Sequence, residues 1–468
     1  MQAWLKIGGQ KVPGKILLLI ASDALLLAIG LATSVALRFQ SVPVIKQYLS
    51  APQNLFRFAV VIVICILALY YNDLYNFELM SRPHELFAMM LQGYGTACVA
   101  LALTYFVVPD IGLGRGIAVI AVLLIPLLAT VWRIVMVRTG FLLAGAERVL
   151  IVGTAQTGIQ LTRKIISQPE LNLRVVGFLD EQGENIGRPL VNPGVVGAVS
   201  DVKEIAESLK VQRVVLSLTE RRGNMPVRAL MHLRFAGIEV EDAHTVYERL
   251  TGRIVLEYLS PSWLILAGGF RRSSLLAVSK RVLDIICAFV GLILLSPFML
   301  ITAIAVRLES RGPILFRQER VGLNEKSFEL LKFRSMHHNS EGETPRWAVE
   351  NDERITRVGK IIRKIRFDEL PQLINVLRGE MSLVGPRPER PYFVDLLNQK
   401  IPFYGLRHTV RPGVTGWAQV RYQYGGSIEE AKTKLEYDLF YVKHLSIMLD
   451  FAILFETAKV LLWQRGAK

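Results

Sequence analysis

The chain has 468 residues, of which 51% are hydrophobic, with a mean hydropathy of +0.36 and a formal net charge of +15. A purely soluble enzyme rarely needs this combination, whereas a membrane protein with a basic cytoplasmic face has it. The length allows two or three domains. The three cysteines lie in apolar runs without metal-ligand or pairing spacing, which argues against zinc sites and disulfides.

Four long apolar runs come first in the chain. They cover residues 16–37, 56–71, 86–108 and 117–137. Each is close to the ~20 residues that a helix needs to cross the hydrocarbon core of a bilayer. Four crossings return the chain to its starting side. The sequence therefore predicts a four-helix transmembrane bundle over residues 1–145.

Strand-like and helical stretches then alternate over residues 146–268. The strand-like runs begin near residues 148, 174, 212 and 238. This alternation predicts a doubly wound, Rossmann-like α/β domain. The turn after the first run has Gly153 and Gly158, but Ala155 replaces the middle glycine of the dinucleotide-binding fingerprint. A Rossmann-like domain that binds no dinucleotide is therefore slightly favoured over one that does.

A fifth apolar segment, residues 281–308, is long enough to span a membrane but is interrupted by Ser296 and Pro297. Proline removes a backbone donor and kinks a helix. A full crossing would put the α/β domain and the later cationic region on opposite sides, so we predict a re-entrant helix. The alternative is an ordinary crossing kinked by proline. Three charged residues at the start are spaced to pair on one helix face: Lys280, Arg281 and Asp284.

An acidic pair, Asp368 and Glu369, lies in a cationic stretch, since residues 354–390 contain nine Lys or Arg against four Asp or Glu. Asp368 has the position of an N-cap for a short helix that Gly379 would end. Such a helix start can seat an anion. A carboxylate beside a bound diphosphate can attack phosphorus, and a second one can help to hold Mg²⁺. The alternative is a plain helix cap beside a solvated charge.

Six motifs follow one another in the last 190 or so residues. They are KRVLD (280–284), the Ser296–Pro297 break, KFRSM (332–336), DELPQL (368–373), VGPRP (384–388) and RPGVTGWAQV (411–420). In this order they resemble the bacterial sugar transferases that are monotopic phosphoglycosyl transferases. With the four leading apolar runs and the Rossmann-like part, the chain is similar to the large-form members. These initiate exopolysaccharide, capsule or O-antigen synthesis.

The resemblance implies an α/β membrane protein with a mostly helical catalytic domain over residues 269–468 and a two-step reaction. Asp368 would attack the β-phosphorus of a UDP-hexose, with glucose or galactose expected, and UMP would leave. Undecaprenyl phosphate would then take the hexose-1-phosphate from the enzyme. Glu369 matches the partner acid that is associated with Mg²⁺, and Asp368 is a second expected ligand. The expected phosphate-binding cations are Lys332, Arg334, Arg363 and Arg387.

The resemblance also implies a place in the bacterial inner membrane, with the active site on the cytoplasmic face. The expected partners are a UDP-sugar, undecaprenyl phosphate, membrane lipids and a second copy of the chain, but no nucleic acid. One rival is a membrane-anchored nucleotide-sugar dehydratase, which usually needs a Tyr-x-x-x-Lys pair that this sequence lacks. Another is a non-catalytic nucleotide sensor that scaffolds polysaccharide assembly. It predicts that Asp368 can be replaced without loss of function.

Overall fold

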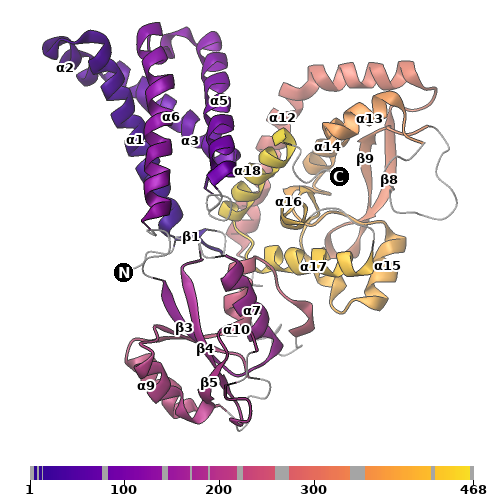
Figure 1. Cartoon of the computed structure of the whole chain (residues 1–468). Helices are drawn as coiled ribbons and strands as arrows, with labels where there is room; N and C mark the ends of the chain where they lie inside the picture. Colours follow the sequence, from indigo (N-terminus) through magenta and orange to yellow (C-terminus); the bar gives the residue numbers. More distant parts are fainter. Residues whose placement is uncertain are drawn as a thin grey trace. The chain divides into compact units, whose positions relative to one another are not determined.

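The computed structural model divides into two compact units, consisting mainly of Lys11–Val246 and of Tyr247–Lys468 (Figure 1). The described residues are 5–7, 10–12, 14–75, 83–139, 146–168, 171–187, 190–218, 225–258, 273–337, 354–422 and 427–463. The predicted domain boundaries at residues 145 and 268 lie outside the described residues. The three-domain division of the sequence therefore stays a prediction.

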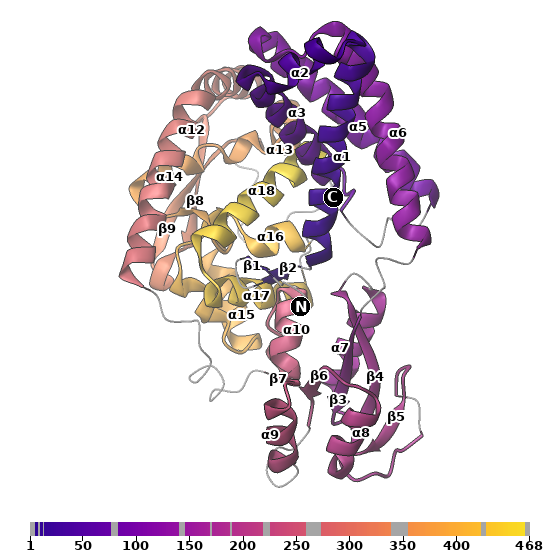
Figure 2. The same ribbon diagram turned by 90° about the vertical axis from the view of Figure 1, so that its left-hand side faces the viewer.

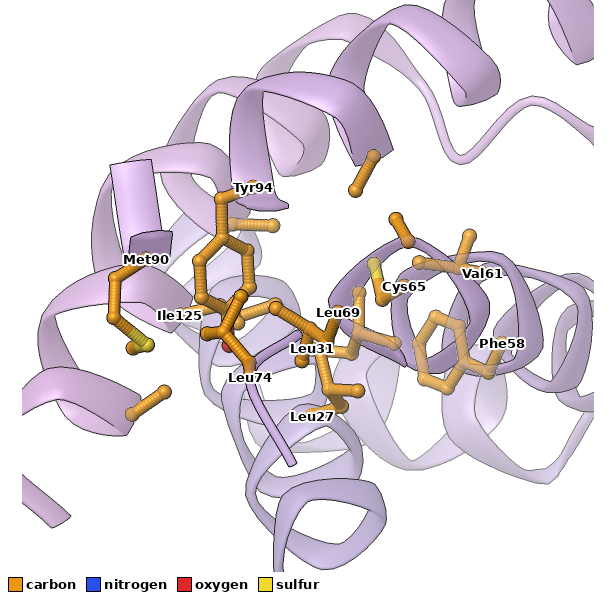
Figure 3. Packing of buried hydrophobic residues seen from close by; sticks show 14 of the residues in the cluster. Leu27, Leu31, Phe58, Val61, Cys65, Leu69, Leu74, Met90, Tyr94 and Ile125 are labelled. Atoms are coloured by element: carbon orange, nitrogen blue, oxygen red, sulfur yellow. The ribbon is translucent and has the colours of Figure 1, made fainter. Parts of the chain in front are cut away.

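Four long apolar helices lie in the first unit, at the four runs expected from the sequence. They are α1 (Gly14–Phe39), α3 (Pro52–Tyr71), α5 (Pro83–Val107) and α6 (Arg115–Arg138). The helix α2 (Val42–Ser50) and the 3₁₀ turn η1 (Pro109–Ile111) accompany them. The strands β1 (Leu5–Ile7) and β2 (Gln10–Val12) pair as a separate two-stranded sheet. Figure 3 shows the shared core of the four long helices, in which Leu31, Leu69, Tyr94 and Ile125 meet. By length and composition each of these helices could cross a membrane.

One buried ion pair lies among these helices. Asp23 of α1 binds Arg133 of α6, with 2.6 Å between Oδ2 and Nη2, and neither side chain is more than 1% exposed. Arg133 also donates to the Leu74 carbonyl, just past α3. A charge without a partner is very costly in such apolar surroundings. The pair therefore fixes how α1 and α6 pack together.

The first unit also contains the predicted Rossmann-like sheet. Its parallel strands have the order β5-β4-β3-β6-β7. The strands β4 and β5 are added on one side of β3 and the strands β6 and β7 on its other side, so the switch in strand order lies between β3 and β6. The strands are β3 (Glu147–Val152), β4 (Leu173–Asp180), β5 (Val195–Ala198), β6 (Arg213–Leu216) and β7 (Glu239–Asp242). Figure 2 shows the strands with their helices, which are α7 (Gln156–Ser167), α8 (Val202–Ser208), α9 (Val227–Phe235) and α10 (Ala243–Thr251), besides the turn η3 (Val199–Asp201).

The glycine turn after β3 is closed by the end of the neighbouring strand. Gly153 has a φ of +100°, and a Cβ there would collide with the Ser217 carbonyl, so the position requires glycine. The Gly158 amide at the start of α7 donates to Ser217 Oγ at 2.9 Å. Asp180, at the end of β4, accepts from Asn185. Groups that a dinucleotide would need thus have partners within the chain, although the absence of dinucleotide binding stays a prediction.

The second unit is mostly helical, as predicted for the C-terminal part. Its helices are α12 (Ser274–Glu309), α13 (Arg357–Lys364), α14 (Gln372–Arg378), α15 (Pro391–Lys400), α16 (Trp417–Arg421), α17 (Ile428–Lys443) and α18 (Ile447–Trp463). Its strands are β8 (Leu315–Val321) and β9 (Ser327–Phe333), which are antiparallel, and β10 (Ser382–Val384) and β11 (Gly413–Thr415), which are parallel. Its 3₁₀ turns are η4 (Leu256–Tyr258), η5 (Leu323–Glu325), η6 (Phe367–Glu369) and η7 (Tyr404–Thr409).

Helix α12, of 36 residues, is a fifth candidate span and changes direction along its length (Figure 1). Pro297 lies inside it and cannot donate to the Ile293 carbonyl four residues earlier. The Ser296 hydroxyl donates to that same carbonyl at 2.8 Å. Ser296 therefore satisfies the acceptor that Pro297 leaves free.

The spacing of the charged residues at the start of α12 predicted that they pair with one another. In the structure they bind other elements instead. Lys280 binds Asp450 of α18 at 2.6 Å, and Arg281 donates to two carbonyls in the last turn of α14. Asp284 accepts from the Ser382 hydroxyl and from the next amide, in β10. A surface pair along one helix contributes only about 0.2–0.5 kcal/mol. The contacts with packed neighbours are more favourable than such a pair, because they satisfy polar groups that folding buries.

The other end of α12 is bonded to the same unit. Glu309 accepts from the Arg357 amide at the start of α13 at 2.7 Å. Arg334, just after β9, donates to the Ser310 and Arg311 carbonyls at 2.7 and 3.2 Å. Both ends of the long apolar helix are therefore held by one compact unit.

Candidate active site

The acidic pair predicted from the sequence meets two of the predicted cations. Glu369 Oε1 accepts from Lys332 Nζ at 2.8 Å and from Arg387 Nη2 at 2.7 Å. Asp368 lies beside it, and each acid is only 8% exposed. The charge of Arg363, on α13, also acts on Asp368. The structure thus brings one acid pair and three cations from β9, α13, η6 and the loop after β10 to one place.

The local structure of the acid pair differs from the helix start that we expected. Gly379 does end α14, with a φ of +86°, as predicted. Helix α14 begins only at Gln372, however, and Asp368 lies in the preceding turn η6 without capping a helix. Arg366 adopts a left-handed conformation, with a φ of +60°, and this turns the chain from α13 into η6. The turn places both acids toward the interior.

Asn375 positions Lys332, and the sequence did not reveal it. Asn375 is fully buried in α14. Its Oδ1 accepts from the Leu331 amide at 3.1 Å and its Nδ2 donates to the Glu329 carbonyl at 2.7 Å, so it bonds the open edge of β9. An amide side chain satisfies a strand edge in this way because it carries both a donor and an acceptor. The available signal was a polar residue within the apolar run LINVL.

The loop that carries Arg387 is fixed by the motif RPGVTG. Strands β10 and β11 pair in parallel, and a Cβ at Gly385 would collide with the Arg411 carbonyl, so the two segments approach closely only with glycine there. The Gly413 amide donates to the Pro386 carbonyl at 2.9 Å. Two motifs that are separate in the sequence therefore form one support for Arg387.

The two acids have opposite pKa shifts. Burial raises the pKa of Asp368 above its usual value, because the nearby Lys332 only partly compensates and Glu369 adds a negative charge. Burial would also raise the pKa of Glu369, but the charges of Arg387 and Lys332 lower it well below the usual value. Adjacent carboxyls with separated pKa values can take different chemical roles.

Arg334 is the one predicted phosphate-binding residue that the structure places elsewhere. Its guanidinium holds the carbonyls that follow α12. Residues 332 and 334 of one strand would share a face, but β9 ends at Phe333 and the alternation ends with it. Arg334 therefore supports the end of α12 and not the acid pair.

Comparison with known proteins identifies the family. Residues 275–464 match the family described as bacterial sugar transferase, and residues 70–241 match one described as CoA-binding domain. A UDP-glucose:undecaprenyl-phosphate glucose-1-phosphate transferase of Caulobacter vibrioides is 45% identical over 185 residues, which are 39% of this chain and 69% of that protein. The chain belongs to the bacterial sugar transferase family. The resemblance found in the motifs is thereby confirmed, and the acid pair lies inside the matched region.

Two other relatives of this sugar transferase match longer stretches. A UDP-N-acetylgalactosamine-undecaprenyl-phosphate N-acetylgalactosaminephosphotransferase of Aeromonas hydrophila is 45% identical over 52% of this chain and 56% of its own length. An undecaprenyl-phosphate glucose phosphotransferase of Komagataeibacter xylinus is 33% identical over 69% of this chain and 60% of its own length. The chain thus spans less than two thirds of these two relatives. Its candidate spans and its relatives indicate a membrane protein.

Proposed function

We propose that the protein transfers hexose-1-phosphate from a UDP-hexose to undecaprenyl phosphate and releases UMP. The observation that carries this proposal is the buried acid pair, in which two cations bind Glu369 while Asp368 keeps one free oxygen. Asp368 Oδ1 is buried and has no hydrogen-bond partner among the residues that the structure describes. The names of the relatives supply the substrate classes.

In the first step, a carboxylate oxygen of Asp368 attacks the β-phosphorus of the UDP-hexose. A bond from that oxygen to phosphorus forms, the bond from phosphorus to the bridging oxygen breaks, and UMP leaves with the electron pair. In the second step, an oxygen of undecaprenyl phosphate attacks the same phosphorus and the Asp368 carboxylate is regenerated. Lys332, Arg363 and Arg387 would bind the phosphate oxygens on which negative charge develops.

The acid pair also fits Mg²⁺. This ion usually binds one or two carboxylates together with substrate phosphates, and Asp368 Oδ1 is a free, hard oxygen ligand. No group of three or more potential ligands gathers among the described residues, so the substrate would have to complete the set. Glu369 and Asp368 would then hold the ion, which would neutralise part of the diphosphate charge.

A panel of UDP-sugars tests the class of reaction and the sugar together. We expect UMP release with UDP-glucose or UDP-galactose, although one relative is named for an N-acetylated sugar, so UDP-N-acetylgalactosamine and UDP-N-acetylglucosamine belong in the panel. GDP-mannose, which lacks uracil, is the control. Release of UMP from none of these sugars would contradict the proposal and favour a nucleotide sensor, a role that the CoA-binding match of residues 70–241 would support.

The pH dependence of UMP release should follow the ionisation of the Asp368 carboxylate. Attack requires the ionised carboxylate, and burial raises its pKa above the usual 3.8. As pH falls, Asp368 therefore becomes protonated earlier than an ordinary aspartate, and kcat/KM should fall with it. Glu369, with its lowered pKa, stays ionised over the same range. A profile of kcat/KM from about pH 4 to about pH 8 reports the free enzyme. A kcat/KM that stays constant from about pH 8 until close to the lower end of this range, as expected for an ordinary aspartate, would contradict this assignment.

For the membrane arrangement, we propose a transmembrane region at residues 1–145, a Rossmann-like domain at 146–268 and a catalytic domain at 269–468. Helices α1, α3, α5 and α6 would cross the bacterial inner membrane, and residues 281–308 would enter and return as a re-entrant helix. The support for re-entry is that both ends of α12 bind the same unit. The active site would face the cytoplasm, where UDP-sugars are made. Self-association stays a prediction.

A further inference from the structure

We propose that Arg407 is a positioning residue of this reaction that acts through Arg387. The inference rests on the proposed function, in which Arg387 binds substrate phosphate. Arg407 lies in η7 and is 6% exposed. Its Nη2 donates to the Arg387 carbonyl at 2.9 Å, so it holds the backbone of that residue without touching either acid of the pair.

The backbone on both sides of Arg387 is fixed by different partners. Arg387 lies between Pro386 and Pro388, whose rings restrict their own φ angles, and Pro388 further restricts the residue before it. The carbonyl before Arg387 accepts from the Gly413 amide, and its own carbonyl accepts from Arg407. The orientations of the peptide planes before and after Arg387 are therefore fixed by hydrogen bonds, and this fixes the direction in which the Arg387 side chain leaves the backbone. Rotation of the second plane would move the guanidinium away from Glu369.

Arg407 is itself held by two buried partners. Its Nη1 donates to the Tyr404 hydroxyl at 2.5 Å, and its Nη2 lies 2.8 Å from Asp438 Oδ2 on α17. Asp438 is 2% exposed, and burial raises its pKa to about 6, so its carboxylate is ionised in an assay at about pH 8. A buried charge is costly unless it is paired. The Asp438 carboxylate therefore offsets the cost of keeping a cation behind the loop.

The contacts of Arg407 require the shape of arginine. Three partners on different elements, namely Arg387, Tyr404 and Asp438, are reached by one planar fork. Lysine would keep the charge but has a single nitrogen on a flexible chain, so it cannot hold the three partners in the same geometry. Arg407→Lys should therefore release the Arg387 carbonyl without burying an unpaired carboxylate.

A double-mutant cycle between Arg407 and Arg387 tests the proposal in the full-length enzyme at about pH 8. Arg407→Lys should lower kcat/KM for UMP release by about 30-fold, because a small misplacement of a catalytic group costs up to about 100-fold. In an Arg387→Ala background the same change should cost less than about twofold, since the group that Arg407 positions is gone. Tyr404→Phe, a milder change, should show the same pattern with a smaller loss.

Arg334→Lys is the matched control. Like Arg407, Arg334 is a buried arginine that donates to backbone carbonyls, but its acceptors are Ser310 and Arg311 and not Arg387. Whatever its effect on kcat/KM, that effect should be equal in both backgrounds. Equal losses for Arg407→Lys in both backgrounds would show a merely structural role and overturn the inference. If Arg407→Lys fails to fold, the Tyr404→Phe cycle decides in the same way. A wild-type enzyme that releases no UMP overturns the proposed function, and with it this inference.

Discussion

Replacement of Asp368 by asparagine is expected to abolish the covalent phosphosugar adduct and to lower UMP release by at least about 1,000-fold. Asparagine has almost the same shape but lacks the anionic oxygen that attacks phosphorus. In intact-protein mass spectra, wild-type enzyme incubated with a UDP-hexose and without lipid acceptor should gain the mass of a hexose phosphate. Asp368→Asn should not.

Asp395→Asn is the matched control, because Asp395 is an exposed aspartate on α15 and the chemical change is the same. This variant should form the adduct and release UMP as the wild type does. Release of UMP by an enzyme that never carries an adduct, with ordered rather than ping-pong kinetics, would point to direct transfer. Full pathway function of Asp368→Asn in cells would instead favour the non-catalytic sensor.

The sequence predicted the acid pair and its cations because they lie in short motifs of unusual composition. It also predicted the long apolar helices and four of the five strands of the Rossmann-like sheet, since burial leaves a clear pattern in sequence. It did not reveal Asn375, Arg407 or Asp438. Each acts through a contact with a segment far away in the chain, and nothing in local periodicity identifies such a partner.

The predictions that failed relied on local geometry where tertiary contacts decide. Asp368 has the position of an N-cap in sequence, but it lies in the turn η6, and its Oδ1 has no hydrogen-bond partner among the described residues. Lys280 is spaced to pair with Asp284, yet Lys280 binds Asp450 of α18 and Asp284 binds Ser382 of β10. Arg334 follows Lys332 at strand spacing, but the strand has already ended. In all three cases packing overrides the preference of a short segment.

Both flanks of α12 are expected to be reachable only from the cytoplasm. A straight helix of 36 residues would extend ~54 Å, more than the ~30 Å hydrocarbon core, and its ends would lie on opposite sides. In the structure, however, Lys280 near its start and Glu309 at its end bind elements of one compact unit. Many apolar side chains between them are exposed, as expected for contact with lipid, for example Phe289, Ile293, Leu294, Leu300 and Ile301.

Single-cysteine labelling, in a background without the three native cysteines, measures from which side of the membrane each end of α12 can be reached. Ser274→Cys, at the first residue of α12, and Arg311→Cys, just past its end, should both react with a membrane-impermeant reagent only after the cytoplasmic side is opened. Gln47→Cys, exposed on α2 between the first two long helices, should react from the periplasm and is the positive control. Reaction of Arg311→Cys from the periplasm, with Ser274→Cys protected there, would show a spanning helix and refute re-entry.

Pro297→Leu should change this topology, although Pro297 is not among the residues that we place around the phosphates. Leucine restores the amide that can donate to the Ile293 carbonyl, which Ser296 now satisfies, and so removes the cause of the break. We expect the variant to lose most UMP release and to expose one flank of α12 to the periplasm. Ile301→Leu, an apolar exchange at an exposed position of the same helix, should change neither. Normal labelling and full activity in Pro297→Leu would mean that the contacts at the two ends of α12, and not the proline, hold it on one side.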